Sequence, residues 1–148
     1  MPQPVFPTTR IENSRLPLVD FDHLPFGKVF ADHMFVAEFQ DGQWQNARIV
    51  PYGEIPTNPA ISALHYGQSI FEGLKAYRDQ KGKVQIFRPY DNMSRMIRSA
   101  GRLCMPAITE DIFIGGLKPF WNWIRNGSHD SPGIPSIYVP SCMPLMNM

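Results

Sequence analysis

The sequence predicts an α+β domain, with antiparallel hairpins followed by two helices packed on the sheet. Two strand-like runs surround the Asp-Gly pair at 41–42, and a second pair of runs surrounds the polar stretch 79–82. Two stretches in which apolar residues recur at helical spacing then follow, within 89–104 and 109–127. At 148 residues, the chain has the length of one ordinary domain.

Composition and charge exclude several classes of protein. The formal net charge is +1 and charged residues make up 18% of the chain, so no electrostatic argument favours nucleic acid or an anionic membrane as a partner. The first residues carry no secretory signal, and no stretch approaches the roughly 18 apolar residues that span a bilayer. Cys104 and Cys142 form no metal-ligand spacing. We therefore expect a cytoplasmic protein without a metal site.

The first part of the chain is expected to form an arm and a hairpin. Residues 1–25 are divided by prolines and polar residues and predict an extended arm. The alternating run 33–39 and the run 44–52 are joined by Asp-Gly, which is a strong signal for a hairpin turn. Three prolines make 51–59 a loop.

A second hairpin is expected to join 70–77 to 84–87. Glu72 and Gly73 interrupt its first strand, which is otherwise moderately apolar. Because side chains alternate along a strand, Lys75 shares a face with Phe71 and lies opposite Glu72.

Two helices and a last short strand at 136–139 complete the prediction. Pro89 suits the first turn of a helix, and Met105-Pro106 ends it. Thr109 is a plausible N-cap for the second helix, with acidic residues in its first turn and Gly127 at its end. The apolar faces are expected at Met93, Met96, Ile97, Ala100, Leu103 and Cys104, and at Ile112, Phe113, Leu117, Phe120, Trp121 and Ile124.

A few residues could carry chemistry, and each has a plainer interpretation. Lys75 could react with a carbonyl compound if its pKa were lowered, but most lysines on strands are solvated. Arg95 is the first of three arginines at i, i+3 and i+7 on the first predicted helix. Their shared face suits a phosphate or carboxylate, and its plainer interpretation is a solvated basic face. Tyr66, in a His-Tyr-Gly run, lines a site or simply ends a loop. No glycine-rich phosphate loop and no nucleophile motif is present.

Four segments together closely resemble one family. They read FGKVFADHM at 26–34, LHYGQSIFEGLK at 64–75, FRPYDNMSRM at 87–96 and SAGRLCMP at 99–106. In order and spacing, from about residue 20 to 139, the chain resembles the branched-chain amino acid aminotransferases, which are pyridoxal-phosphate enzymes of fold type IV. D-amino-acid aminotransferases and aminodeoxychorismate lyases share that fold and are the alternatives. The resemblance implies the small N-terminal domain of such an enzyme.

The resemblance also implies site residues. Arg95 matches the arginine that holds the 5′-phosphate of pyridoxal 5′-phosphate. Phe26, Tyr66 and Phe71 match aromatic residues that line the pocket for an aliphatic side chain, which must be recognised by apolar shape. Lys75 matches a lysine near the site that does not bond the cofactor, and Tyr138 matches a tyrosine of the final strand.

The implied reaction moves the amino group of leucine, isoleucine or valine to 2-oxoglutarate in a homodimeric enzyme. In the family, the lysine that bonds the cofactor lies in a larger second domain. We therefore expect no catalytic residue in this chain, and no activity of the chain by itself. The expected organisation is an arm at 1–25, a small domain at 26–139 and an aberrant tail at 140–148. A non-catalytic remnant that binds a partner is the alternative.

The tail departs from the family pattern. Pro140 stands where the family has an arginine, and residues 141–148 do not resemble the family continuation. A change of reading frame after Val139 is our expectation, and the nucleotide sequence beyond that codon tests it.

Overall fold

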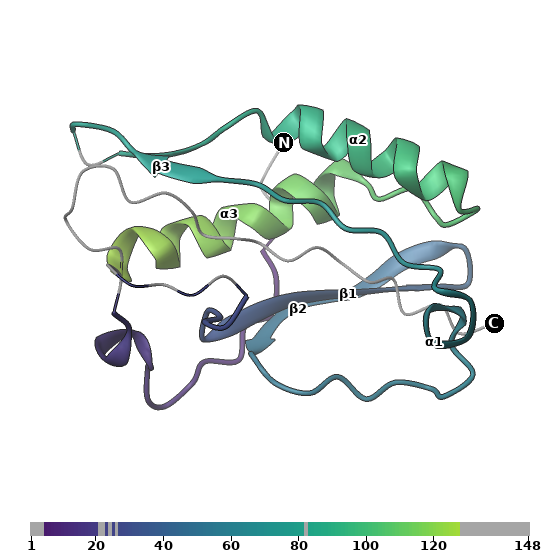
Figure 1. Ribbon diagram of the computed structural model, residues 1–148, viewed down its shortest axis with the longest axis horizontal. Helices are drawn as coiled ribbons and strands as arrows, with labels where there is room; N and C mark the ends of the chain where they lie inside the picture. The colour runs from purple at the N-terminus through teal and green to yellow at the C-terminus, as the bar shows by residue number, and fades with distance from the viewer. Residues whose placement is uncertain (1–4, 21–22, 24, 26, 82, 128–148) are drawn as a thin grey trace.

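The structure is a computed structural model, and it describes residues 5–127 apart from 21–22, 24, 26 and 82. Figure 1 shows an α+β arrangement of two hairpins and helices, which confirms the predicted fold class. The predicted strand at 136–139 and the tail at 140–148 lie outside the described residues. Among the described residues, none of the helices combines the length and apolar character needed to cross a bilayer.

The first hairpin is confirmed. It pairs β1 (His33–Gln40) with β2 (Gln43–Pro51) in antiparallel register, with Phe35 opposite Ile49. Asp41 and Gly42 both have positive φ, 53° and 78°, and a two-residue hairpin turn of type I′ requires that combination. A bulge between Val36 and Glu38 shifts the register near the turn.

The second hairpin is shorter than predicted. It consists of β3 (Ala76–Arg78) and β4 (Val84–Ile86), so the expectation of a strand from residue 70 was wrong for 70–75. At Gly73, side chains rather than a neighbouring strand supply the hydrogen-bond partners of the backbone. Its N–H donates to the Glu72 carboxylate and its carbonyl accepts from the Asn92 side chain, each at 3.0 Å. The segment is extended but does not join the ladder there.

A short helix, α1 (Ser62–Tyr66), precedes this segment and was not predicted. It ends at Gly67, which adopts a left-handed conformation with φ 63°. Periodicity cannot reveal a helix of five residues, because its length barely exceeds one turn. The helix places Tyr66 a few residues before the extended segment 70–75.

Both predicted long helices are confirmed. Helix α2 (Pro89–Arg102) starts at the proline, and α3 (Glu110–Gly127) starts after Thr109, whose carbonyl accepts the first helical hydrogen bond from Phe113 at 2.9 Å. Helix α2 ends earlier than its apolar pattern indicates. Leu103 and Cys104 follow it and are exposed, with Cys104 at φ 54°.

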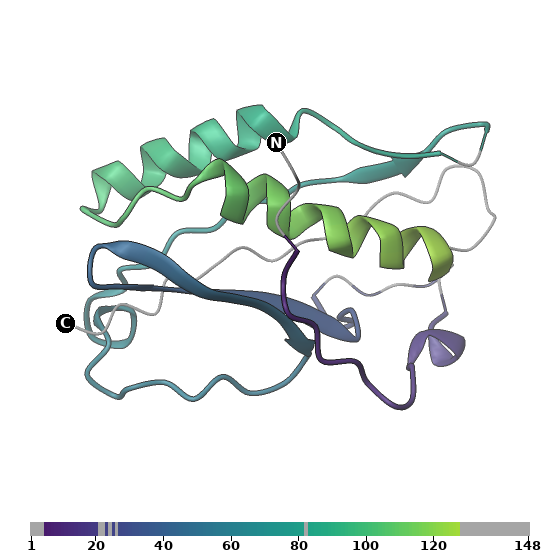
Figure 2. The same ribbon diagram turned by 180° about the vertical axis from the view of Figure 1, so that it is seen from behind.

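Helix α3 lies between α2 and the β1–β2 hairpin in both views (Figures 1 and 2). It is therefore covered on two sides, and residues 112–117 are all buried. Helix α3 meets the first hairpin where Gly116 faces Phe35, and α2 packs on α3. The buried core they share consists of Ile70, Leu74, Met96, Ala100, Met105, Ile108, Ile112, Phe113, Ile114 and Leu117.

The N-terminal arm is attached to the first hairpin by backbone hydrogen bonds. The N–H of Ile49 donates to the carbonyl of Pro7, and its carbonyl accepts from Thr9, both at 2.9 Å. Ile49 is only 1% exposed. Further along the arm, Asp32 accepts hydrogen bonds from Ser14 and Arg15. Part of the arm thus adds to the sheet edge next to the most buried residue of β2.

Candidate functional site

The extended segment 70–75 presents two different faces. Ile70, Glu72 and Leu74 are buried, whereas Phe71 is 79% exposed and Lys75 is exposed. This is the period-2 pattern of an extended chain. It agrees with the predicted faces, with Lys75 beside Phe71 and opposite Glu72, although the segment is not a strand.

Glu72 is the unusual member of the buried face. Its side chain is 3% exposed and lies between two apolar core residues. Burying an ionised carboxylate is unfavourable unless it is paired and hydrogen-bonded. Arg95 of α2 supplies this pairing: its Nε donates to one carboxylate oxygen at 2.8 Å, and its Nη2 donates to the other.

The electrostatics of this pair follow from its hydrogen bonds. The side-chain hydrogen bonds from Arg95 outweigh the opposing effect of burial and lower the pKa of Glu72 below its ordinary 4.5. The same hydrogen bonds raise the pKa of Arg95 above its ordinary value. Both groups are therefore charged at neutral pH, and the pair is a fixed ion pair at the edge of the core.

Within the described part of the chain, hydrogen bonds hold the Arg95 guanidinium on the side that faces Glu72. Its side chain remains 61% exposed although it is paired with Glu72. A guanidinium has more N–H donors than this pair uses, and they are fixed in one plane. Those remaining donors point away from the buried carboxylate. They are chemically suited to a phosphate or carboxylate outside the core, so the donor set fits an anionic group.

The structure does not join the other predicted residues that it describes to Arg95. Tyr66 ends α1 and is 83% exposed, and its ring contacts that of His65 with centroids 6.3 Å apart. Among the described residues, no hydrogen bond, ion pair or ring contact links Tyr66, Phe71 or Lys75 to Arg95. Phe26 and Tyr138 lie outside the described residues.

Sequence reasoning missed the two residues that organise the site. Glu72 was given no role in the site, yet it pairs with Arg95, which lies 23 positions further along the chain. Asn92, one helical turn before Arg95, ties α2 to the carbonyl of Gly73. The available signal was a charged residue on the inward face of an apolar run, which requires a partner of opposite charge.

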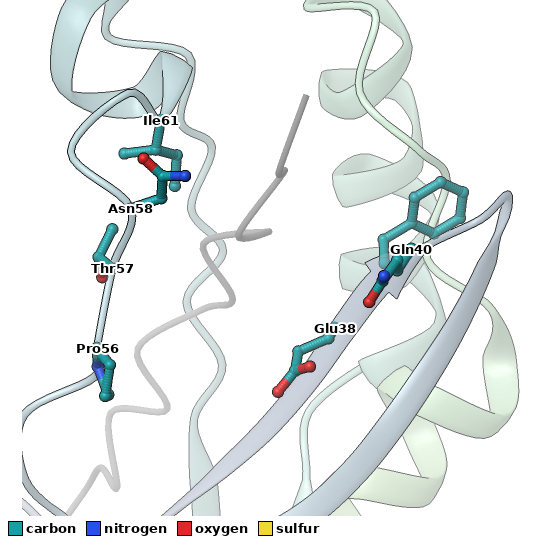
Figure 3. A pocket seen from close by; sticks show the side chains of 7 residues that line it. Glu38, Gln40, Pro56, Thr57, Asn58 and Ile61 are labelled. Atoms are coloured by element: carbon teal, nitrogen blue, oxygen red, sulfur yellow. The ribbon is translucent and has the colours of Figure 1, made fainter.

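A separate hollow of about 380 Å³ lies between β1 and the loop before α1 (Figure 3). Its one charged residue, Glu38, already accepts hydrogen bonds from Asn46 and Arg48, which lower its pKa. Among the residues that the structure describes, none of those predicted for the site lines it. Its lining consists of Glu38, Phe39, Gln40, Pro56, Thr57, Asn58 and Ile61.

Comparison with known proteins gives a consistent result. No family model matches the chain. The chain is 42% identical to branched-chain-amino-acid aminotransferase 2 of Bacillus subtilis over 131 residues, which are 84% of this chain and 36% of that protein. It is 47% identical to the branched-chain-amino-acid aminotransferase of Mycolicibacterium smegmatis over 63% of this chain and 26% of that protein. It is 41% identical to the chloroplastic aminotransferase 5 of Arabidopsis thaliana over 82% of this chain and 29% of that protein.

These similarities define a class of proteins, aminotransferases, and a family within it. Over the stretch that it shares with them, the chain belongs to the branched-chain-amino-acid aminotransferase family. The chain spans about a third of the length of the curated relatives it matches.

Proposed function

We propose that this chain supplies the phosphate anchor and part of the substrate pocket of a pyridoxal-phosphate-dependent aminotransferase for leucine, isoleucine and valine. The single observation that carries the proposal is the Arg95 guanidinium, which is fixed by Glu72 on one edge and open on the other. Identity to branched-chain aminotransferases over most of the chain supports the substrate class.

The cofactor role assigned to this chain is binding and orientation. Pyridoxal 5′-phosphate, when bound, supplies an electron sink for the α-carbon of the amino acid. Arg95 would hold its phosphate through the donors that Glu72 leaves open, and a fixed cation at a dianion needs little rearrangement on binding. An anchor fixed in this way would limit the orientations that the bound cofactor can take.

The substrate role assigned to this chain is apolar recognition. Phe71 and Tyr66 are exposed aromatic side chains on the segment that leads to Glu72. Branched aliphatic side chains offer no polar group, so a pocket must recognise them by shape and exclusion of water. We propose that these two residues and Phe26 form one wall of such a pocket, with Lys75 and Tyr138 at its edge.

The proposal places the reacting amine outside this chain. We also propose that the complete enzyme is a homodimer and that it is located in the cytoplasm. The division into an arm at 1–25, a small domain at 26–139 and a tail at 140–148 is part of the same proposal.

A fusion protein tests the proposed function. Residues 1–139 of this chain are joined to the part of the Bacillus subtilis aminotransferase 2 that lies beyond the matched stretch, and glutamate formation is measured with 2-oxoglutarate and one amino donor at a time. We expect glutamate from leucine, isoleucine and valine, and none from D-alanine. A folded fusion protein that uses D-alanine alone, or no donor at all, would overturn the assignment.

The unfused chain provides the second measurement. We expect the 148-residue chain with leucine, 2-oxoglutarate and pyridoxal 5′-phosphate to form no glutamate above the rate of the cofactor in buffer. Leucine-dependent glutamate formation well above that rate would show that a residue of this chain reacts with the cofactor.

A further inference from the structure

We propose that Glu72 is a positioning residue, whose buried carboxylate orients the Arg95 guanidinium so that its open edge receives a phosphate group. The inference rests on the proposed function, because it adds Glu72 to Arg95 as a second residue of the proposed phosphate-binding site. Glu72 does not touch the phosphate; it acts through Arg95.

The carboxylate is well placed to act as a fixed support. Glu72 is 3% exposed, and its carboxylate also accepts the N–H of Gly73 at 3.0 Å. A carboxylate that is buried in the core and hydrogen-bonded to the adjacent backbone N–H cannot follow the movements of an arginine side chain. The arginine instead takes the direction that the carboxylate sets, since both Nε and Nη2 donate to it. This side-on pairing defines the plane of the guanidinium as well as its position.

The backbone around Glu72 is itself attached to α2. Asn92 donates to the carbonyl of Gly73 at 3.0 Å, one helical turn before Arg95 on the same helix. The segment and the helix are therefore joined at two successive turns. A shift of the carboxylate relative to the base of the arginine would break one of these two attachments.

Orientation matters here because the arginine is largely in water. A free arginine side chain loses much of its rotamer freedom when it is fixed by a ligand. An arginine that is already fixed has lost this rotamer freedom before the phosphate binds, so its affinity for the phosphate is higher. Against this, the negative charge of Glu72 reduces the net positive charge that the phosphate meets.

These two effects predict opposite results when Glu72 is changed. If orientation dominates, removal of the carboxylate weakens phosphate binding. If charge dominates, removal of the carboxylate strengthens it, because Glu72 then acts as a competitor. The burial of Glu72 favours orientation, since a competitor must be able to leave the arginine, and at 3% exposure this carboxylate would lose its ionic partner without gaining contact with water.

The experiment is a titration of the 148-residue chain with inorganic phosphate, followed by the nuclear magnetic resonance signal of the Arg95 Nε–H. The variants are Glu72→Gln, which keeps an oxygen acceptor, and Glu72→Met, which keeps the length of the side chain without an acceptor. Arg102→Gln, about two turns further along α2, is the control for general loss of positive charge. A second titration compares pyridoxal 5′-phosphate with pyridoxal.

We expect the dissociation constant for phosphate to rise roughly threefold to tenfold in Glu72→Met, with Glu72→Gln between that variant and the wild type. Arg102→Gln should leave the Arg95 response unchanged. The preference for pyridoxal 5′-phosphate over pyridoxal should fall in the same order. A purely structural role of Glu72 does not predict this order, because it does not distinguish the phosphate ester from pyridoxal.

The outcomes separate this inference from the proposed function. Equal or tighter phosphate binding in both Glu72 variants overturns the positioning role and leaves Arg95 as the anchor. No response of Arg95 to phosphate in the wild type overturns both. If Glu72→Met does not fold, the comparison of Glu72→Gln with the wild type decides by the same criterion.

Discussion

At residue 72 the fold buries a carboxylate within an otherwise apolar run, and Arg95 from a different element pairs with it. Such a pair does not have to stabilise the protein, because desolvation opposes the attraction between the charges. What the pair does provide is direction: the arginine is fixed at its inner edge and open at its outer edge. The chemistry proposed for this chain depends on that direction.

The stability of the protein should depend on pH through the ionisation of Glu72. Hydrogen bonds from Arg95 lower the pKa of Glu72 below 4.5, so its stabilising contribution is complete above that pH and is lost as the pH falls through the lowered value. Glu72→Gln cannot ionise. The wild type should therefore exceed this variant in free energy of unfolding at neutral pH, and the difference should shrink below pH 4.5. Urea denaturation at several pH values measures it.

The control for this prediction is Glu54→Gln, which removes a carboxylate at an exposed loop position. A difference between the wild type and Glu72→Gln that stays constant from neutral to acidic pH would show that the Glu72 carboxylate contributes nothing through its charge.

At the scale of elements, β1 and α3 approach each other closely at Gly116. A Cβ atom added at Gly116 of α3 would lie 2.8 Å from the Phe35 ring of β1. The ring cannot move away freely, because it also packs edge-on against Phe6 of the arm, with centroids 5.0 Å apart. Glycine at 116 is therefore a requirement of packing between a helix and a strand.

Gly116→Ala should accordingly destabilise the fold. Overpacking costs about 1–3 kcal/mol, whereas the better helix propensity of alanine returns only about 0.5–1 kcal/mol. Chemical denaturation of Gly116→Ala, Phe35→Leu and the double variant gives the coupling energy. We expect the double variant to be more stable than the sum of the two single effects indicates. Strict additivity would contradict the proposed contact.

A second contact links elements across the layers. Trp44 of β2 donates its Nε1–H to the carbonyl of Ala107, in the connection between α2 and α3, at 2.9 Å. Trp44→Phe keeps most of the ring and removes the donor. The free energy of unfolding should fall by about 0.5–1.5 kcal/mol. An unchanged stability would show that water replaces this hydrogen bond without loss.

At the scale of the whole molecule, the described structure leaves one side of the segment 66–77 uncovered. Tyr66, Phe71 and Tyr77 are 83%, 79% and 46% exposed. Exposed aromatic side chains on one segment are typical of a surface that contacts another part of a protein or a ligand. This agrees with the proposal that the segment lines a pocket completed elsewhere.

The uncovered segment predicts self-association of the 148-residue chain. Sedimentation at increasing concentration should show larger species, and Phe71→Ser should reduce their amount severalfold because it removes a large exposed apolar surface. Leu18→Ser, at another exposed apolar position, is the matched control and should have little effect. Equal behaviour of the two variants would contradict a specific role of this segment.

The sequence predicted those parts of the fold that depend on neighbours along the chain. The Asp41-Gly42 turn, Pro89 at the start of α2 and Thr109 before α3 all act locally, and all were confirmed. The attachment of the arm to Ile49 depends on residues some 40 positions apart, and no local pattern reveals it. The strand predicted from residue 70 failed because Asn92 and Glu72 satisfy the backbone there.

The same distinction between local and long-range interactions applies to the site. Resemblance to the family assigned Arg95 a phosphate, and this assignment stays a proposal. Its pairing with Glu72 could not be deduced, because the two residues are 23 positions apart and lie on different elements. Only the burial of a charged residue between Ile70 and Leu74 required that some partner exist.

The most direct test of the proposed role of this chain is the affinity of the fusion protein for pyridoxal 5′-phosphate relative to pyridoxal, measured by absorbance titration. We predict that Arg95→Gln lowers this preference roughly 10- to 100-fold, and that Arg102→Gln leaves it unchanged. A folded Arg95→Gln protein that keeps the full preference for the phosphate ester would contradict the account.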